Sequence, residues 1–436
     1  MIPTNRFIIM VTIGALLIGF SGHLQQLMAA GIALICVTIL ATLGEYVKLK
    51  NSVNLQVSRI CDEKLSLGAQ NPIRISLRNR SYMTLRGMVR DEYPEGFDAK
   101  GNAAPFCISP RADLELSCTV IPSKRGDFEF ADTYVRINGP LGLAIMQMKY
   151  NTKQPIKVYP NLLDMRRYEI GLRRERPVQP GQKVVRVYGM GTDFESLREY
   201  VPDDEFRSID WKASARRGKF ITRQYEAEKS QNIMLVLDCG RIMGPIVNGL
   251  TRLDHSINAA MMLAHVATTK GDKVGIMAFA EDIISYLPPR AGKSQTLNLL
   301  RLTYNLSDAS GDSNYYRAIP YLSKRWTRRS LIVFFTDLVD PQSSKPLISQ
   351  ISGLARKHLC VCVSMADPAV IEAASGRLDE SADAFKAAAA RQVLQARKLA
   401  AAQLAHAGAI VIDVLPDKLT PDVVNEYLNI KGRARL

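Results

Sequence analysis

The sequence predicts an α/β protein in three structured parts: an N-terminal transmembrane helical hairpin, a small antiparallel β-sandwich and a C-terminal doubly wound α/β domain. Three patterns lead to this prediction: two uncharged apolar runs at the start, period-two alternation over 51–160, and apolar runs alternating with helical segments over 231–436. The 436 residues are 47% hydrophobic and 23% charged, which suits two or three globular domains and excludes general disorder.

The charge balance and the cysteine pattern narrow the classes of function. Lys and Arg number 57 against 42 for Asp and Glu, so the net charge is +15. Such an excess suits contact with an acidic partner, such as an anionic membrane surface, an acidic protein face or nucleic acid. The seven cysteines are scattered and form no CxxC pair. This pattern disfavours a disulfide framework and a zinc ribbon, and it is typical of a reducing compartment.

Two uncharged apolar runs within residues 1–50 predict the membrane hairpin. They span about 7–22 and 27–44, and at about 1.5 Å per residue they reach about 24 and 27 Å, close to the roughly 30 Å of a hydrocarbon core. A signal peptide is the alternative for the first run, but no A-x-A site precedes a soluble segment. A buried soluble hairpin is the other alternative, and it explains poorly why so few residues are polar.

The flanking charges predict the orientation of this hairpin. Arg6 precedes the first run, Lys48 and Lys50 follow the second, and the short loop between the runs carries neither Lys nor Arg. The positive-inside rule then places both ends, and everything after residue 50, in the cytoplasm.

Alternation of apolar and polar residues predicts the β-sandwich over 51–160. The pattern is clear in 53–57, 73–77 and 114–120, and turn signals such as Gly139-Pro140 separate the runs. No cluster of nucleophiles or metal ligands falls in this part of the sequence. We therefore expect the domain to act as a spacer or docking module.

A basic linker opens the segment 161–230. Its cations lie among prolines and a glycine: Arg166, Arg167, Arg173, Arg174, Arg176, Lys183 and Arg186. A solvated linker is the plain interpretation, and contact with anionic lipid headgroups is a sharper one because the anchor keeps the chain near the membrane. Nucleic-acid binding is poorly supported, because no aromatic residues are interleaved and no nucleic-acid motif occurs.

The end of the same segment predicts a short, heavily charged helix. The acids at 203–205 suit the start of a helix, Phe206, Ile209 and Ala213 recur on one helical face, and Gly218 suits a left-handed end. A strand is expected directly after it. The cluster includes one of the two tryptophans, so a docking surface and a structural cap are both open interpretations. The candidate partner-binding residues are Arg207, Asp210, Trp211, Lys212 and Arg216.

These residues resemble a known family, the fifty-eighth numbered family of domains of unknown function, which comprises bacterial proteins with a von Willebrand factor A-like domain. The matching residues are Phe194, Leu197-Arg198-Glu199-Tyr200, Pro202, Asp204, Arg207, Ile209-Asp210-Trp211-Lys212-Ala213, Ala215-Arg216 and Arg223, with Pro122, Arg125-Gly126, 139–143 and 158–160 upstream. Members are typically membrane-anchored and encoded beside MoxR-type AAA+ ATPases. The resemblance therefore implies such an ATPase as a partner and a place in the bacterial inner membrane, as a multi-pass protein.

The C-terminal part, 231–436, predicts a mainly parallel sheet with helices on both faces. Strands are expected at 233–237, 274–279, 283–287 (an edge strand), 331–335, 359–363 and 409–414. Helices are expected at 253–269 and 297–306, over the alanine-rich stretch 382–407, and from Thr420-Pro421 onward.

Two strands of this sheet end in acids, Asp238 and Asp337, at the edge where such sheets bind ligands. In von Willebrand A domains this edge holds an Asp-x-Ser-x-Ser loop, a threonine and an acid that bind a metal, usually Mg²⁺. Here Asp238 keeps the first place, Gly240 and Ile242 replace both serines, and Ser313 stands for the threonine. The resemblance thus implies only a degenerate, weak metal site formed by Asp238, Ser313 and Asp337. The other possibility is that the acids merely cap helices and turns.

The expected function is binding without catalysis. No HExxH, GxSxG or complete phosphate loop occurs in the sequence. We expect a membrane-anchored, non-enzymatic adaptor that presents charged surfaces to a protein partner, with a MoxR-type ATPase implied by the resemblance, in assembly or remodelling of envelope or other complexes. The alternative is a metal-dependent hydrolase that uses Asp238 and Asp337.

Overall fold

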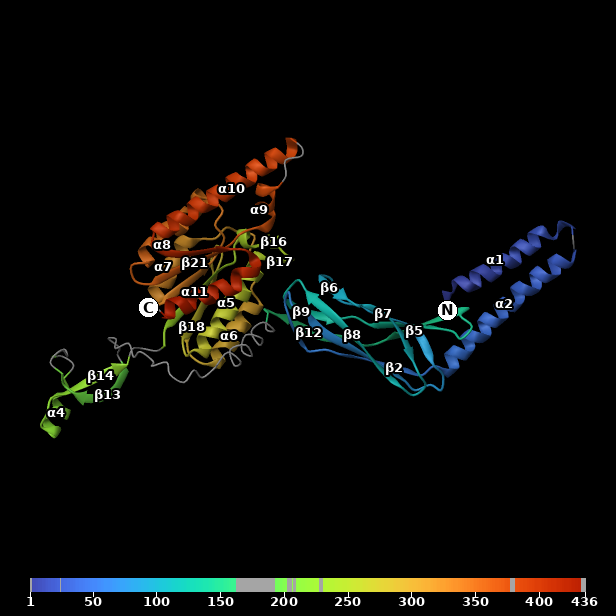
Figure 1. Cartoon of the computed structure of the whole chain (residues 1–436), viewed down its shortest axis with the longest axis horizontal. Helices are drawn as coiled ribbons and strands as arrows, with labels where there is room; N and C mark the ends of the chain where they lie inside the picture. Colours follow the sequence, from blue (N-terminus) through green and yellow to red (C-terminus); the bar gives the residue numbers. More distant parts are fainter. Residues whose placement is uncertain are drawn as a thin grey trace. The chain divides into compact units, whose positions relative to one another are not determined.

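The computed structural model describes residues 2–23, 25–161, 193–201, 206, 209–226, 230–376 and 381–432 (Figure 1). They form a mixed α/β protein with two compact units, 1–163 and 164–436. The basic linker cations and Arg207 lie outside the described residues. Each unit is described in turn.

Unit 1 begins with two apolar helices that lie side by side, drawn in blue in Figure 1. They are α1 (Asn5–Gly19) and α2 (Gln25–Ser52), joined by a 3₁₀ turn at Phe20–His23. Their close approach requires glycine, because a Cβ on Gly14 would lie 2.6 Å from the Ile35 side chain, and one on Gly31 would lie 2.7 Å from the Gly14 carbonyl oxygen.

Among the described residues, α2 is the one helix long and apolar enough to cross a membrane. Helix α1 has 15 residues and ends at Gly19, three residues before the end of the predicted span, because the chain turns into the 3₁₀ segment there. At about 1.5 Å per residue α1 reaches about 22 Å, which is short of a full span.

The β domain consists of three sheets. The five-stranded sheet has the order β1 (Ile2–Pro3), β11 (Ala144–Tyr150), β10 (Thr133–Asn138), β5 (Leu85–Asp91) and β7 (Ala103–Ile108). The four-stranded sheet has the order β2 (Leu55–Ile60), β4 (Asn71–Asn79), β8 (Asp113–Pro122) and β6 (Phe97–Lys100). The three-stranded sheet has the order β3 (Lys64–Ser66), β12 (Gln154–Tyr159) and β9 (Gly126–Phe130). The two larger sheets are antiparallel throughout, and β4 alternates buried with less buried residues along its whole length. A buried ion pair joins the two larger sheets, because Arg59 on β2 donates from Nε to Asp91 Oδ2 on β5 at 2.9 Å.

The carboxylate of Glu45 fastens α2 to the loop that precedes β11. Glu45 is buried, and its two oxygens accept hydrogen bonds from four successive backbone amides, those of 141–144, at 2.6 to 3.0 Å. The start of the chain binds the same loop, since Thr4 donates from Oγ1 to the Gly142 carbonyl at 2.6 Å and β1 pairs with β11. The apolar helices and the β domain are therefore joined by hydrogen bonds at both ends of the hairpin.

Unit 2 contains a small module at the end of the segment 161–230, which we call the signature module because it carries the residues that resemble the family. Strands β13 (Asp193–Glu199) and β14 (Ile221–Glu226) pair antiparallel, and helix α4 (Trp211–Arg217) lies between them in the sequence. Gly218 ends the helix in the left-handed conformation, with φ of 66°, as predicted, and a strand follows.

The predicted start of this helix is wrong. Ile209 forms a β-bridge with Thr222, so it cannot belong to a helical face, and α4 begins only at Trp211. The physical reason is the cap: the Asp210 side chain accepts a hydrogen bond from the Ala213 amide at 3.0 Å. The acids at 203–205 lie outside the described residues.

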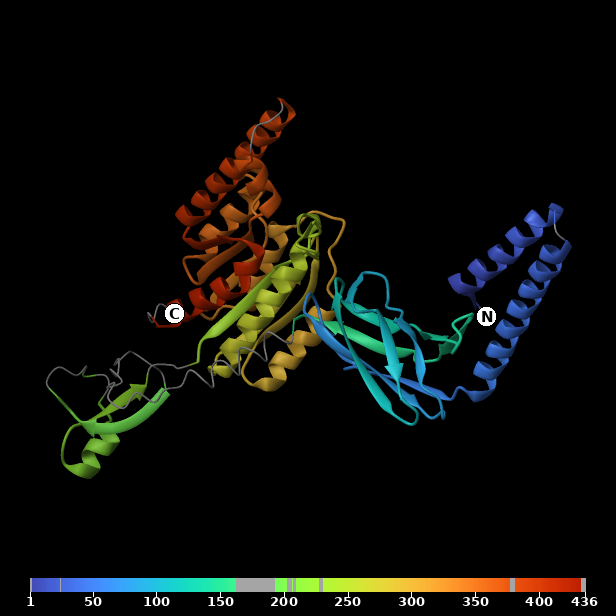
Figure 2. The same ribbon diagram turned by 45° about the vertical axis from the view of Figure 1, so that its right-hand side comes forward.

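The main body of unit 2 is a six-stranded sheet with helices on both faces (Figure 2). Its order is β19 (Ile283–Arg290), β18 (Lys273–Phe279), β15 (Asn232–Asp238), β20 (Leu331–Phe335), β21 (Leu359–Met365) and β22 (Ala409–Val414). All pairs are parallel except that of edge strand β19. The buried apolar runs that predicted these strands are confirmed as strands. A short hairpin, β16 (Ile246–Val247) and β17 (Leu250–Thr251), precedes the first helix.

Two helical layers cover the sheet. One comprises α7 (Tyr315–Arg325), α8 (Pro341–Leu354) and α10 (Ser381–His406), which contribute buried residues to the same hydrophobic cluster as Met234 and Val236 of β15. Helix α9 (Pro368–Ser375) lies against α10. The other comprises α5 (Arg252–Thr269), α6 (Lys293–Tyr304) and α11 (Pro416–Gly432). Two predicted helix starts are wrong: α6 begins at Lys293, and α11 at Pro416, whose fixed φ suits a first helical position.

Removing the Glu45 carboxylate should loosen the loop it binds. In Glu45→Ala, four amides, two of them buried, lose their acceptor, which we expect to cost about 3 kcal/mol locally and so to speed hydrogen exchange of residues 141–144 about a hundredfold. Hydrogen exchange of the full chain in detergent, read by mass spectrometry, measures this. Glu129→Ala, at an exposed position of β9, is the control and should leave the exchange unchanged. Unchanged protection in Glu45→Ala would contradict the role of this carboxylate.

Candidate functional site

The carboxyl edge of the parallel sheet brings together the residues that the sequence singled out there. Asp238 ends β15 and is fully buried. Its Oδ1 accepts from the Gly240 amide at 2.9 Å and from Ser313 Oγ at 2.5 Å, and its Oδ2 accepts from the hydroxyls of Tyr315 and Thr336, both at 2.7 Å. Burial and the negative charge of Asp238 hold the pKa of Tyr315 well above its usual value. Neutral donors therefore already occupy both oxygens of Asp238.

Asp337, two residues beyond the end of β20, is held by two arginines. Arg397 donates from Nη1 to Asp337 Oδ1 at 2.7 Å, and Arg252 forms an ion pair with Oδ2. Each arginine also binds a second acid, Arg397 binding Asp413 at 2.8 Å and Arg252 binding Asp367 at 3.3 Å. Burial, and then the charge of Arg397, lower the pKa of Arg252. Two guanidinium groups and three carboxylates thus form one arginine–carboxylate network.

The residues present at this edge do not fit a divalent cation. Mg²⁺ needs near-octahedral oxygen coordination, whereas the oxygens of Asp238 accept from hydroxyls and an amide, and Asp337 is neutralised by arginine. A Cβ on residue 240 would lie 2.1 Å from Ser313 Oγ, so a serine there would require the Ser313 side chain to move away. Among the described residues, no group of three or more His, Cys, Asp or Glu is placed to hold a metal. The weak Mg²⁺ site and the metal-dependent hydrolase therefore find no support in this geometry.

Sequence reasoning missed both arginines. Arg252 opens α5 and lies far from Asp337 in the sequence, so no local pattern points to the pair. Arg397 did leave a signal: it lies at the three- and four-residue spacing of the buried stripe of α10, with Ala390, Ala400 and Leu404. An arginine in an apolar stripe must find a buried acid, and that requirement predicts an ion pair without naming its partner.

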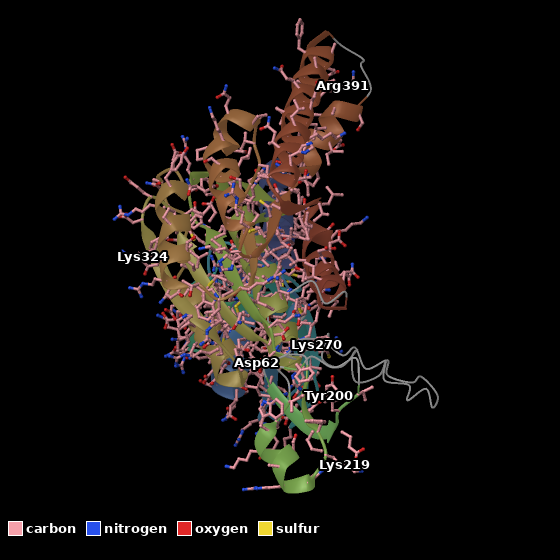
Figure 3. All side chains as sticks on the ribbon, turned by 90° about the vertical axis from the view of Figure 1, so that its left-hand side faces the viewer. Asp62, Tyr200, Lys219, Lys270, Lys324 and Arg391 are labelled. Carbon is pink, nitrogen blue, oxygen red and sulfur yellow. The ribbon has the colours of Figure 1, made fainter. Side chains whose placement is uncertain are left out.

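The signature module carries a second candidate site, an exposed aromatic patch that we define as Tyr200, Phe206, Trp211 and Phe220. Tyr200 contacts Phe206 and Phe220 edge to face, with ring centroids 6.1 and 6.2 Å apart, and Phe220 contacts Trp211 at 6.3 Å. Nevertheless Phe206, Trp211 and Phe220 are 70%, 61% and 58% exposed. Figure 3 shows Tyr200 on this module with Lys219 near its end. Large aromatic side chains left in water in one place are typical of a binding surface.

The candidate partner-binding residues divide within this module. Trp211 is part of the aromatic patch, and Lys212 and Arg216 are exposed on α4. Asp210 has a structural role instead, since its carboxylate caps the helix. Arg207 lies outside the described residues. Sequence reasoning weighed the docking surface from Trp211 and the charges, and it missed the other three aromatic residues of the patch.

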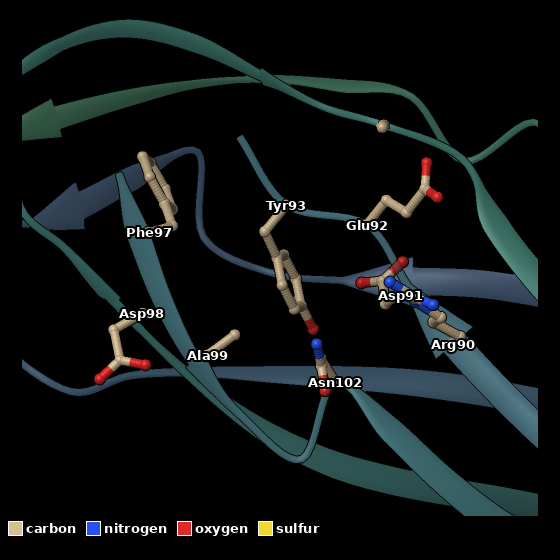
Figure 4. A pocket seen from close by; sticks show the side chains of 9 residues that line it. Arg90, Asp91, Glu92, Tyr93, Phe97, Asp98, Ala99 and Asn102 are labelled. Carbon is tan, nitrogen blue, oxygen red and sulfur yellow. The ribbon is translucent and has the colours of Figure 1, made fainter. Parts of the chain in front are cut away.

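A recess of about 460 Å³ in the β domain is lined by polar side chains, among them Asp91, Tyr93 and Asn102 (Figure 4). Asp91 is already paired with Arg59, and the Tyr93 hydroxyl donates to Cys118 Sγ at 3.2 Å. Burial and the nearby charge of Asp91 raise the pKa of Tyr93. Because the domain itself supplies partners for these groups, we assign no ligand to this recess.

Comparison with known proteins adds a family likeness. Residues 196–380, which include the aromatic patch, match the family described as "Protein of unknown function DUF58". The chain is 28% identical to the uncharacterised protein YeaD of Bacillus subtilis over 192 residues, 42% of this chain and 48% of that protein. It is 23% identical to an uncharacterised protein of Mycobacterium tuberculosis over 195 residues, 44% of this chain and 60% of the relative. The chain thus spans about half the length of these relatives.

Among solved structures, the conserved hypothetical protein BatB from Bacteroides thetaiotaomicron is similar, with a TM-score of 0.34 and 15% identity over 47% of this chain and 100% of that chain. The CARDB domain of the PF1109 protein from Pyrococcus furiosus is similar to 24% of this chain over 94% of its own length, with a TM-score of 0.19 and 11% identity. Both likenesses are too weak to argue from.

Breaking the arginine–carboxylate network should destabilise unit 2. In Arg397→Leu, Asp337 and Asp413 lose a buried partner, which we expect to lower the free energy of unfolding by about 3–5 kcal/mol. Urea unfolding of the full chain in detergent, followed by tryptophan fluorescence, measures this. The control is Arg391→Leu on the same helix, whose side chain is exposed and bonds to the Ala374 carbonyl. Equal stability of the two variants would contradict the network's role.

The same geometry makes a prediction about metals. Because arginine and neutral donors satisfy Asp337 and Asp238, titration of the full chain with Mg²⁺ or Mn²⁺ should give no specific binding heat at micromolar concentrations. Isothermal titration calorimetry measures this, with Asp238→Ala as the comparison. Micromolar binding that disappears in Asp238→Ala would show that a metal site exists after all.

Proposed function

We propose that this chain is a membrane-anchored adaptor that binds a protein partner and breaks no bonds itself. The observation that carries the proposal is the exposed aromatic patch in the segment that matches the family. Trp211 touches only one ring of the patch, Phe220, and is otherwise largely in water. Aromatic side chains that already contact one another edge to face lose little conformational entropy when a partner binds. This small entropy loss favours a role of the patch in docking.

The anchor in this proposal is the N-terminal hairpin. Helix α2 supplies one membrane-spanning element, and the proposal extends the span to α1, which packs along it and whose exposed residues include Ile8, Ile9 and Ile13. The positive charges that flank the hairpin support a bacterial inner-membrane protein, multi-pass, with its β and α/β domains in the cytoplasm.

The C-terminal domain in this proposal is von Willebrand factor A-like, with the metal replaced by arginine. The parallel sheet with one antiparallel edge strand and helices on both faces supports the assignment. Binding that depends on a metal ion is not part of the proposal, because the network around Asp337 supplies the positive charge from within the chain.

The partner in this proposal presents an acidic surface. Helix α4 carries exposed Lys212, Arg216 and Arg217 beside the aromatic patch, and an acidic face would complement them. The resemblance noted from the sequence points to a MoxR-type AAA+ ATPase, acting with this chain in assembly or remodelling of envelope or other protein complexes. In this proposal the aromatic contacts provide most of the binding affinity, and the cations increase the rate of association with the partner.

Truncating the exposed tryptophan should weaken this partnership. In Trp211→Ala we expect the affinity for a purified MoxR-type ATPase from the same organism to fall about thirtyfold, which corresponds to about 2 kcal/mol for a central aromatic contact. Biolayer interferometry with the full chain in nanodiscs measures it. Phe385→Ala is the matched control, because Phe385 is 78% exposed on α10, outside the patch. Equal affinities, or no binding by the wild-type chain, would overturn the proposal.

A further inference from the structure

A cleft of about 790 Å³ opens where the first helix meets the β domain of unit 1. Its walls come from three segments far apart in the sequence: the start of α1, strand β5 and the turn before β11. The lining residues used below are Arg6, Arg86 and Gly139. The cleft belongs to neither the aromatic patch nor the sheet edge.

The cleft is positively charged. Arg6 and Arg86 line it, and none of its lining residues is acidic. Arg6 donates from Nη1 to the Leu141 carbonyl at 3.3 Å, and among the described residues neither arginine is placed in an ion pair. Both guanidinium groups are exposed and keep donors for a ligand. An anion would therefore find two cations here.

One acid, Glu45, lies close to the cleft, and its single negative charge is outnumbered by the two arginines. A Cβ on Gly139 would lie 2.2 Å from the Glu45 carboxylate, so the acid lies directly behind the turn. However, its two oxygens are occupied by the four amides of 141–144, and the side chain is buried. The Glu45 carboxylate therefore holds the turn in place and, among the described residues, forms no ion pair with Arg6 or Arg86.

The position of the cleft indicates what kind of anion fits. Arg6 lies in the first turn of α1, and the next residues, among them Ile8 and Ile9, are apolar and exposed, as a lipid-facing surface would be. Leu141, at the tip of the turn beside the cleft, is 59% exposed. Where the proposed anchor enters the bilayer, an arginine pair next to apolar side chains lies at the level of the lipid headgroups.

We propose that this cleft binds the phosphate of one anionic phospholipid, with Arg6 and Arg86 as its ligands. Guanidinium groups suit phosphate because their paired N–H donors match its oxygens. The inference rests on the membrane anchorage in the proposed function, but it needs no protein partner. Because Glu45 and Thr4 fix the walls of the cleft, a bound headgroup would set the orientation of the β domain on the membrane.

The test counts lipids bound to the full chain. Wild-type protein in a neutral detergent is offered equal amounts of phosphatidylglycerol and phosphatidylcholine with identical acyl chains, and native mass spectrometry gives the bound ratio. We expect wild type to retain one phosphatidylglycerol in preference. In Arg6→Gln/Arg86→Gln that preference should fall about 20–30-fold, from about 1 kcal/mol per cation near an anionic surface. The matched control, Arg90→Gln/Arg136→Gln, removes two exposed arginines of the same sheet outside the cleft.

Three outcomes separate the explanations. Loss of preference in the cleft variant alone supports the site. Equal loss in the control variant overturns it, because the preference would then reflect the general positive charge of the domain. The absence of any preference in wild type also overturns it. Displacement of the lipid by equimolar inorganic phosphate would show a soluble-phosphate site and also overturn the lipid assignment. A separate flotation with neutral liposomes tests the anchorage: a chain that floats but lacks the preference refutes only this inference.

Discussion

Buried carboxylates, each matched by its own donors, hold the described parts of this chain together. Asp337 joins α5 and α10 to the sheet through two arginines, and Glu45 joins α2 to the turn before β11 through four amides. Asp272, fully buried, fastens α11 by accepting from Lys431 at 2.6 Å and from the Tyr427 hydroxyl at 2.5 Å. A carboxylate taken out of water costs several kcal/mol unless it is paired, so each of these contacts fixes which segments must meet.

The same constraint explains why the acids at the sheet edge are paired with arginines and hydroxyls from within the chain. A divalent metal and a pair of arginines are alternative ways to neutralise a buried acid, and a site that uses one has little room for the other. Here Arg252 and Arg397 reach Asp337, while Ser313 and Thr336 turn their hydroxyls to Asp238. Both acids are therefore satisfied by partners within the folded chain. In the proposed function, recognition falls to the surface side chains of the signature module.

A structural feature could be predicted from the sequence when neighbouring residues decide it, and not when residues far apart in the sequence decide it. The strands of the parallel sheet were predictable because a buried strand is a continuous apolar run, as β20 is from Leu331 to Phe335. Gly218 was predictable because one residue decides a left-handed helix end. The start of α4 was not, because Ile209 pairs with Thr222 across the module and the Asp210 side chain caps the helix one residue later. The arginine–carboxylate network was invisible, since its members come from five separate segments.

The contribution of a contact to the free energy of folding distinguishes the contacts that serve folding from those proposed to serve binding. Every buried acid discussed above is satisfied within the chain, so changing it would mainly unfold something. The aromatic patch and the two cleft arginines are the reverse: Trp211 and Phe220 remain in water, and Arg6 and Arg86 have no acidic partner in the walls of their cleft. Folding gains little from either arrangement, because exposed rings bury little area and exposed cations gain little Coulomb energy. Side chains that contribute little to the fold yet gather in one exposed place are the ones best placed to act on something outside it.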